Sequence, residues 1–241
     1  MVGFKTIFLE KLEPDIKNGA IKSILDLGSG LSLNFLPLLK KFPELTYVGV
    51  EPSKEHAKQA RLTLAGFKNA KIYNADGYVS SGDKWGTFDL VISFSVLEHI
   101  KQLEKFLKNS IAAARPGGLV VHCWDLGHAL HPSSFKERLQ VWLGNHLPAV
   151  LPEHKFVRML FPSEASRLME RYGLKIEKIS YHQMYCHKAF LNLLDQSETE
   201  AENLARELIE WEFKAFSLIN GMKEEERLRL FPTVAMVARK I

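Results

Sequence analysis

The sequence is poor in cysteine, in long apolar runs and in charge of one sign. Only Cys123 and Cys186 stand among its 241 residues, too few for a disulfide framework and typical of a reducing compartment. No apolar run approaches the roughly 20 residues that a membrane-spanning helix needs. The Met1–Lys5 stretch lacks the long apolar core of a signal peptide. We therefore expect a cytoplasmic protein with no membrane partner.

The charge and composition indicate a globular protein that does not act on nucleic acid. The net charge is +4 and no dense block of Lys or Arg occurs, so a nucleic-acid partner is not expected. Hydrophobic residues make up 46% of the chain and charged residues 25%, the balance of a folded domain. A chain of this length can bury roughly 70–75% of its unfolded surface. We expect one domain over residues 1–241.

The first half alternates short apolar runs with helical patterns, which is typical of βαβ units and a parallel sheet. Leu33–Phe42 predicts an apolar helix, and Ser53 is the expected N-cap of the next one. The nearly all-apolar run Phe88–Phe94 predicts a strand buried on both faces. Arg115-Pro116-Gly117-Gly118 predicts a turn. The expected strands are 21–27, 46–51, 71–74, 88–94, 119–124, 174–181 and 233–238.

The second half is less regular and contains one long connection. Residues 125–161 follow the fifth expected strand, and structureless connections of that length are uncommon. We interpret this segment as a lid over a second binding pocket, with a helix that carries Phe135, Leu139 and Trp142. A further helix is expected to begin at Ser163 as its cap. An apolar stripe over residues 201–218 predicts a helix that contacts the core or forms a homodimer contact.

The strongest chemical signal is Asp26-Leu27-Gly28-Ser29-Gly30, which ends a strand and opens a helix. Glycines allow close backbone approach to a ligand, and a helix N-terminus offers unpaired N–H groups. In an open parallel sheet, ligands bind beyond the carboxyl ends of the strands. Glu51 ends the second strand about 20 residues later, where a carboxylate can accept bonds from both ribose hydroxyls. The pair predicts a nucleotide-like ligand.

With these motifs, the chain resembles class I S-adenosylmethionine-dependent methyltransferases over about residues 20–125 and the terminal strands. The resemblance implies that the loop with Asp26, Gly28 and Gly30 binds the methionine part of the cofactor, and that Glu51 binds its ribose. An Asp after the third strand, here Asp76, is expected near the adenine amino group. The segment 88–99 and the turn 115–118 also resemble the family pattern. The expected cofactor contacts are Asp26, Gly28, Gly30, Glu51, Asp76, Gly77 and Ser93.

The resemblance implies a Rossmann-like α/β fold: a seven-stranded, mostly parallel sheet with helices on both faces and an antiparallel C-terminal strand pair. The sequence departs from the family pattern at two points. Ser32 stands where the commonest loop has a third glycine, and the fourth strand lacks an Asn/Asp-Pro-Pro-Tyr-like motif. The latter argues against methylation of an adenine amino group or a glutamine amide. A dinucleotide cofactor fits less well, because the loop lacks the third glycine of the dinucleotide fingerprint.

The candidate catalytic residues are His128 and His131 in the lid segment. A hydroxyl acceptor usually needs a base, and histidine titrates near neutrality. Loop hydrogen bonding is the simpler interpretation of both side chains. A metal site is not expected, because no Cys or carboxylate completes a recognised ligand spacing around His128, His131 and His154. In the N-terminal segment, Phe4 and Phe8 are expected to pack over the cofactor.

The sequence thus predicts an S-adenosylmethionine-dependent methyltransferase that acts on a small-molecule acceptor, with O-methylation favoured. Two alternatives stay open. One keeps the fold but transfers an aminopropyl group, a chemistry that calls for carboxylates around a polycationic acceptor. The other is a regulatory or scaffold protein that binds the cofactor without turnover. The acceptor itself lies beyond the sequence, because fold and cofactor do not determine substrate.

Overall fold

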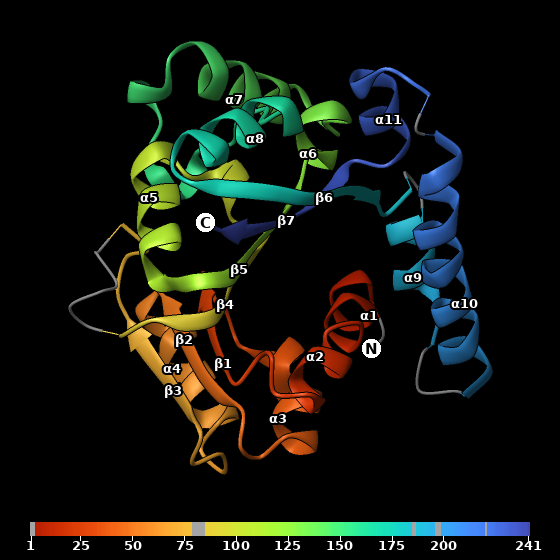
Figure 1. Ribbon diagram of the computed structural model, residues 1–241. Coiled ribbons are helices and arrows are strands. Elements are labelled where there is room, and N and C mark those ends of the chain that lie inside the picture. The colour runs from red at the N-terminus through yellow and green to blue at the C-terminus, as the bar shows by residue number, and fades with distance from the viewer. Residues whose placement is uncertain (1–2, 79–84, 185–186, 196–198, 220) are drawn as a thin grey trace.

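A computed structural model describes residues 3–78, 85–184, 187–195, 199–219 and 221–241. Its centre is a seven-stranded sheet in the order β3-β2-β1-β4-β5-β7-β6 (Figure 1). The first five strands are parallel, and β7 is antiparallel to both β5 and β6. The strands are β1 Ser23–Leu27, β2 Thr46–Glu51, β3 Ala70–Asn74, β4 Phe88–Phe94, β5 Ala114–Asp125, β6 Leu174–His182 and β7 Thr233–Lys240.

Helices cover both faces of the sheet, which confirms the predicted fold. By position in the chain, one group of helices lies before or between the parallel strands, and the other group lies between β5 and β7 (Figure 1). The first group is α1 Phe4–Glu10, α2 Glu13–Lys17, η1 Leu33–Phe35, α3 Leu36–Lys41, α4 Lys54–Thr63, η2 Leu97–His99 and α5 Leu103–Ala113. The second is α6 Gly127–Leu130, α7 Phe135–His146, η3 Pro148–Val150, η4 Glu153–Lys155, α8 Pro162–Arg171, α9 His187–Leu193, α10 Thr199–Ala215, η5 Phe216–Ile219 and α11 Glu224–Leu230.

The two larger apolar clusters of the core lie one on each side of the sheet. Side chains alternate along a strand, so Leu90 and Ile92 of β4 join the cluster beneath α1, α3 and α4, while Val91 joins the cluster beneath α5 and α8. All three are wholly buried. The predicted burial of this strand on both faces is therefore confirmed.

Three local predictions need correction. The 115–118 segment is not a separate turn: it lies within β5, where Ala114 already pairs with Phe88 and a register shift follows. The apolar segment 33–42 is a short 3₁₀ turn, η1, followed by α3, whose Pro37 lies in the first turn. Ser163 is inside α8, not its cap, because the helix begins at Pro162 and the Ser163 hydroxyl instead donates to Glu224 (2.8 Å).

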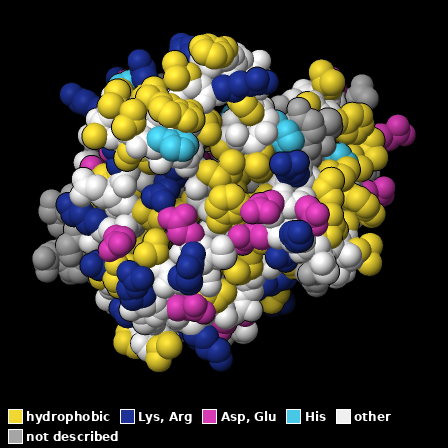
Figure 2. Space-filling view, turned by 90° about the horizontal axis from the view of Figure 1, so that it is seen from above, with side chains coloured by type: hydrophobic (Ala, Val, Ile, Leu, Met, Phe, Trp, Pro, Cys, Tyr) yellow, Lys and Arg dark blue, Asp and Glu magenta, His cyan; other side chains and the backbone are white. Residues whose placement is uncertain are grey.

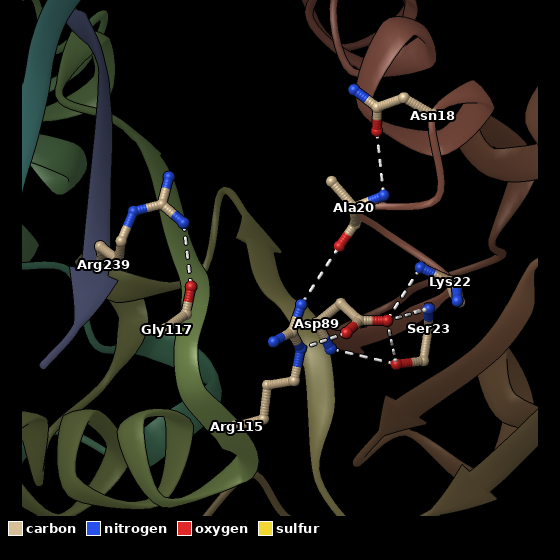
Figure 3. Close-up of polar contacts among 8 residues, drawn as sticks. All are labelled: Asn18, Ala20, Lys22, Ser23, Asp89, Arg115, Gly117 and Arg239. Atoms are coloured by element: carbon tan, nitrogen blue, oxygen red, sulfur yellow. Dashed lines mark hydrogen bonds and ion pairs between the residues drawn. The ribbon is translucent and has the colours of Figure 1, made fainter.

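The amino ends of the parallel strands are tied together by one carboxylate (Figure 3). Asp89 Oδ2 accepts hydrogen bonds from the backbone N–H of Lys22 (2.8 Å) and of Ser23 (2.9 Å). The Arg115 guanidinium donates to the other carboxylate oxygen, and also reaches the carbonyl of Ala20 (3.3 Å). These contacts join β1, β4 and β5 at the edge opposite to the one where parallel sheets bind ligands.

Candidate active site

The loop after β1 requires glycine at one position. Gly28 has a φ of +77°, and a Cβ there would lie 2.5 Å from Val96 Cγ2. Its N–H donates to the carbonyl of Val50 (2.8 Å). Gly30 also has a positive φ, 53°, but a Cβ there would meet nothing within 4 Å. Packing therefore demands glycine at Gly28, whereas Gly30 leaves the backbone open to a ligand.

Glu51 connects the end of β2 to this loop. Its Oε2 accepts a hydrogen bond from the N–H of Gly30 (2.9 Å), and its Oε1 accepts one from the N–H of Ser53 (2.9 Å). The side chain is buried. Each carboxylate oxygen has a second lone pair with which to accept a further hydrogen bond. The acid that the sequence assigns to ribose thus lies beside the glycine loop.

Asp26 lies beneath the same loop as a buried acid. The Tyr47 hydroxyl donates to Asp26 Oδ2 (2.9 Å) and lies 3.1 Å from the Ser32 hydroxyl. Burial raises the pKa of Asp26 to about 7, against the lowering effects of the Tyr47 hydrogen bond and of the positive charge of Lys5. The carboxyl group therefore changes charge near neutral pH, in a position where a cationic ligand group would favour its ionised form.

Asp26, Gly28 and Gly30 line a cavity of about 360 Å³, within the range of small-ligand sites. We call it the glycine-loop cavity. The Ser29 hydroxyl beside its wall is buried and faces the Tyr47 hydroxyl. The wall consists of Lys5, Asp26, Gly28, Ser29, Gly30, Leu31, Ser32, Leu33, Asn34, Phe94 and Ser95.

The other three expected cofactor residues differ in their surroundings. Asp76 follows β3 and is exposed, with its Oδ1 accepting from the N–H of Tyr78 (2.9 Å). A Cβ on Gly77 would lie 2.7 Å from the Phe106 ring, so packing alone accounts for this glycine. Ser93 is wholly buried, and its hydroxyl lies 2.7 Å from Nδ1 of His122. The structure thus gives the Ser93 hydroxyl a partner in the core.

Two further cavities continue from the glycine loop. The central cavity, about 780 Å³, shares Lys5, Asn34 and Ser95 with the glycine-loop cavity. It lies between α1 and the helices α9 and α10, which stand side by side with α1 at one side of the molecule (Figure 1). The histidine cavity, about 380 Å³, shares Gln183 and Asn192 with the central cavity. The three cavities are therefore adjacent along the carboxyl edge of the sheet.

The histidine cavity brings together both predicted catalytic residues. His128 and His131 line it with Asp125 at the end of β5 and Gln183 after β6. His131 Nε2 lies 3.3 Å from the carbonyl oxygen of Arg229. His128 also borders a smaller cavity against Glu137 of α7. The two histidines therefore lie together in one cavity, which adjoins the central cavity on the side away from the glycine loop.

Backbone strain marks residues that the sequence did not reveal. Among the described residues, Ser32, Ser95 and Gln183 are the non-glycine residues with positive φ, at 58°, 56° and 56°. All three line the glycine-loop, central or histidine cavities. Such conformations are costly and concentrate at functional sites. Ser32 stands at the position of the family's third glycine, which fits its positive φ, whereas no sequence pattern identifies Ser95 or Gln183.

The N-terminal helix contributes a cation to the same site. Lys5 of α1 lines both the glycine-loop and the central cavity, with its ammonium 5.7 Å from the centre of the Phe94 ring. The neighbouring Phe4 and Phe8 are buried. Phe4 stacks on His182, with ring centres 4.5 Å apart, and Phe8 meets Phe94 edge to face at 6.0 Å. These aromatic contacts anchor α1 over the carboxyl edge of the sheet.

Among the described residues, no group of three or more His, Cys, Asp or Glu side chains is placed to hold a metal ion. Cys123 is buried without a disulfide partner, and burial raises the pKa of its thiol. Cys186 lies outside the described residues. No helix in the described part of the chain has the length and apolarity to cross a membrane.

A mostly parallel sheet with a glycine loop and an acid at the end of the second strand defines a Rossmann-like ligand-binding protein. Residues 7–179 match the family model described as "Methyltransferase domain". Along 98% of its length, the chain is also similar to the solved structure of an S-adenosylmethionine-dependent methyltransferase from Archaeoglobus fulgidus, with a TM-score of 0.56. That likeness covers 94% of the archaeal chain at 16% identity and shows the fold. The chain belongs to the class I S-adenosylmethionine-dependent methyltransferases, a family whose cofactor is S-adenosylmethionine.

Curated relatives differ in the atom that they methylate. The chain is 24% identical over 162 residues to a ubiquinone biosynthesis O-methyltransferase of Rhizobium johnstonii, and the alignment covers 64% of this chain and 60% of the relative. It is 27% identical over 157 residues to the ajmaline N-methyltransferase of Rauvolfia serpentina, and that alignment covers 62% of this chain and 54% of the relative. The match thus spans little more than half the length of these relatives.

Proposed function

We propose that this protein transfers a methyl group from S-adenosylmethionine to an oxygen atom of a small-molecule acceptor. The observation that carries the proposal is the adjacency of the cavities: the central cavity shares walls with both the glycine-loop cavity and the histidine cavity. One end offers a site suited to the cofactor, and the other offers side chains that can accept a proton.

The glycine-loop cavity fits the methionine and ribose parts of the cofactor. When bound, S-adenosylmethionine supplies an electrophilic methyl group on a sulfonium. The ionised Asp26 suits an ammonium group, and Lys5 suits a carboxylate across the same cavity. Glu51 has lone pairs for ribose hydroxyls, and Asp76 stands after β3 as the adenine contact that the family pattern implies. Gly28 and Gly30 expose backbone without a side chain at two positions of the loop.

The histidine cavity supports oxygen as the acceptor atom. A hydroxyl must lose its proton during methylation, and His128 or His131 is placed to take it. The segment 125–161 supplies both residues and forms one wall of this site, as a lid would. An aminopropyl transfer receives less support, because Glu10 and Glu202 near the central cavity both pair with Arg206 and are not left for a polycation.

Calorimetric titration with S-adenosylmethionine, S-adenosylhomocysteine and decarboxylated S-adenosylmethionine tests the cofactor assignment. Glu51→Gln should weaken binding of the first two by about 10- to 100-fold, because a hydrogen bond to a charged group contributes about 1.5–3 kcal/mol. Glu55→Gln on the adjacent helix is the matched control and should bind normally. Lys5→Met should weaken S-adenosylmethionine but not its decarboxylated form. Binding of the decarboxylated form alone would favour aminopropyl transfer instead.

Kinetics on a panel of phenols and other hydroxylated acceptors test the base. We expect His128→Gln or His131→Gln to lower kcat by roughly 100-fold or more, the usual contribution of a general base. His154→Gln, from the same segment but outside these cavities, should keep the rate. Unchanged rates in both variants would refute the base assignment. Tight cofactor binding with no turnover on any acceptor would point to a scaffold.

A further inference from the structure

Helix α7 packs onto the protein through its polar and small side. Gly144 is its only buried residue, and a Cβ there would lie 1.9 Å from the carbonyl oxygen of Val157. Gln140 and Glu137 lie one and two turns before it on the same side, half-buried, and Gln140 donates to the carbonyl of Lys155 (2.5 Å). A helix of a globular protein normally turns its apolar side inward. On α7, Val141 and Leu143 are half-buried, but the bulkiest apolar side chains are turned outward.

The apolar side of α7 faces solvent. Phe135, Leu139 and Trp142 recur at the spacing of one helical stripe, and are 81%, 46% and 50% exposed. Leu147 and Val150 continue it past the helix end, at 48% and 66% exposure. Figure 2 views the molecule from the side of α7 and α8, and shows apolar side chains gathered beside Lys and Arg side chains.

The charges around this stripe are cationic. Lys136 and Arg138 flank it on α7, and both are exposed. The nearby carboxylates Glu137 and Glu153 are hydrogen-bonded within the protein at its surface. Glu137 accepts hydrogen bonds from the N–H (2.7 Å) and the hydroxyl (2.9 Å) of Ser133, and Glu153 accepts one from Tyr78. We call Phe135, Lys136, Arg138, Leu139 and Trp142, with Leu147 and Val150, the α7 surface.

We propose that the α7 surface docks onto an anionic lipid bilayer, with α7 lying in the plane of the interface. Apolar and aromatic side chains enter the boundary between headgroups and acyl chains, while flanking Lys and Arg side chains meet anionic headgroups. A second copy of this chain is a poorer partner for the same face. A two-fold axis through the stripe would bring Lys136 and Arg138 towards their own copies, without carboxylates to meet them. This docking neither requires nor alters the proposed chemistry.

Vesicle flotation of the whole protein tests the proposal. The protein should float with vesicles of phosphatidylcholine and phosphatidylglycerol, and at least about tenfold less with phosphatidylcholine alone. Phe135→Ser with Trp142→Ser should lower partitioning by about tenfold or more, because both side chains are inserted. Lys136→Glu with Arg138→Glu should abolish the preference for the anionic vesicles. Leu62→Ser, an equally exposed apolar position on α4 (69%), is the matched control and should partition as the wild type.

Two results would overturn the proposal. One is a wild-type protein that stays out of the vesicle fraction at both compositions. The other is a wild-type dimer in sedimentation velocity that Trp142→Ser converts to a monomer, with no vesicle binding, because the α7 surface would then be a contact between copies. Cofactor binding by each variant shows that it is folded, since the substituted side chains are exposed and lie outside the glycine-loop cavity.

Discussion

At the scale of single residues, Asp26 carries the most informative chemistry. Its carboxyl group is 3% exposed and shares the Tyr47 hydroxyl with Ser32. Because burial raises its pKa to about 7, Asp26 in the folded protein holds a proton over the pH range from about 4 to about 7, where the unfolded chain has lost it. The contribution of this group to the free energy of unfolding therefore falls as the pH rises through that range, and is constant above it.

The same titration predicts a pH-dependent affinity for S-adenosylmethionine. A cationic ammonium group binds ionised Asp26 best, so affinity should rise with pH up to about 7 and approach a tenfold change per unit well below that value. Calorimetry between acidic and neutral pH, in buffers of different ionisation enthalpy, measures the affinity and the proton released. Asp26→Asn should remove the dependence.

A second variant, Tyr47→Phe, tests the same pH dependence of cofactor affinity. It removes the hydrogen bond that lowers the pKa of Asp26, so the inflection should move to higher pH while the shape of the curve is kept. An affinity that does not change with pH in the wild type would show that Asp26 is not the group that meets the ammonium.

At the scale of elements, one contact of α7 is unusually close. The helix meets the rest of the protein where Gly144 approaches the backbone of Val157, and neither backbone can move without shifting the segment that carries it. Gly→Ala in a helix interior ordinarily stabilises by about 1 kcal/mol. Gly144→Ala should have the opposite sign, because the added methyl group overlaps a carbonyl oxygen.

We expect Gly144→Ala to destabilise the packing of α7 by about 1–3 kcal/mol, the usual cost of an overpacked site. Amide hydrogen exchange over residues 135–146 should be faster in the variant. Gly66→Ala is the control, since a Cβ there meets nothing within 4 Å, and its exchange should match the wild type. Slower exchange in Gly144→Ala would mean that helix propensity outweighs the contact.

At the scale of the whole molecule, the carboxyl and amino edges of the sheet, where the parallel strands end and begin, have different roles. The carboxyl edge holds the cavities, while the amino edge is tied by Asp89 to β1 and β5 (Figure 3). Burial alone would raise the pKa of Asp89, but hydrogen bonds from the Lys22 N–H, Arg115 and Ser23 together lower it. The stability that Asp89 contributes is therefore present above its ordinary pKa and is lost as the pH falls through the depressed value.

Asp89→Ala should lower the free energy of unfolding by roughly 1–3 kcal/mol at neutral pH, because it leaves the N–H groups of Lys22 and Ser23 without a hydrogen-bond acceptor. Urea denaturation measures the change, and the difference from the wild type should shrink in acid. Glu44→Gln, an exposed acid before β2, is the control and should stay within about 0.5 kcal/mol of the wild type. Cofactor affinity should be unchanged, because Asp89 lies at the opposite edge from the site.

Much of this architecture could be predicted from local patterns. Strands 46–51 and 88–94 lie where their apolar runs predict them, and Ser53 caps α4 by accepting from the N–H of His56. The role of the 115–118 segment could not be predicted from the local pattern, because pairing of Ala114 with Phe88 makes the segment part of β5. Ser163 likewise has the composition of a cap, but tertiary contact with Glu224 uses its polar groups.

The sequence by itself determined the order of strands and helices, the glycine loop and the acids at the ends of β1, β2 and β3, because these depend on periodicity and on backbone freedom within a few residues. Only the tertiary structure decided the surroundings of those residues. It brought Lys5 to Asp26, His128 and His131 to Gln183, and the polar side of α7 to Val157. Each of these contacts joins segments far apart in the chain, and their proximity follows from the packing of helices on a common sheet, which no local pattern encodes.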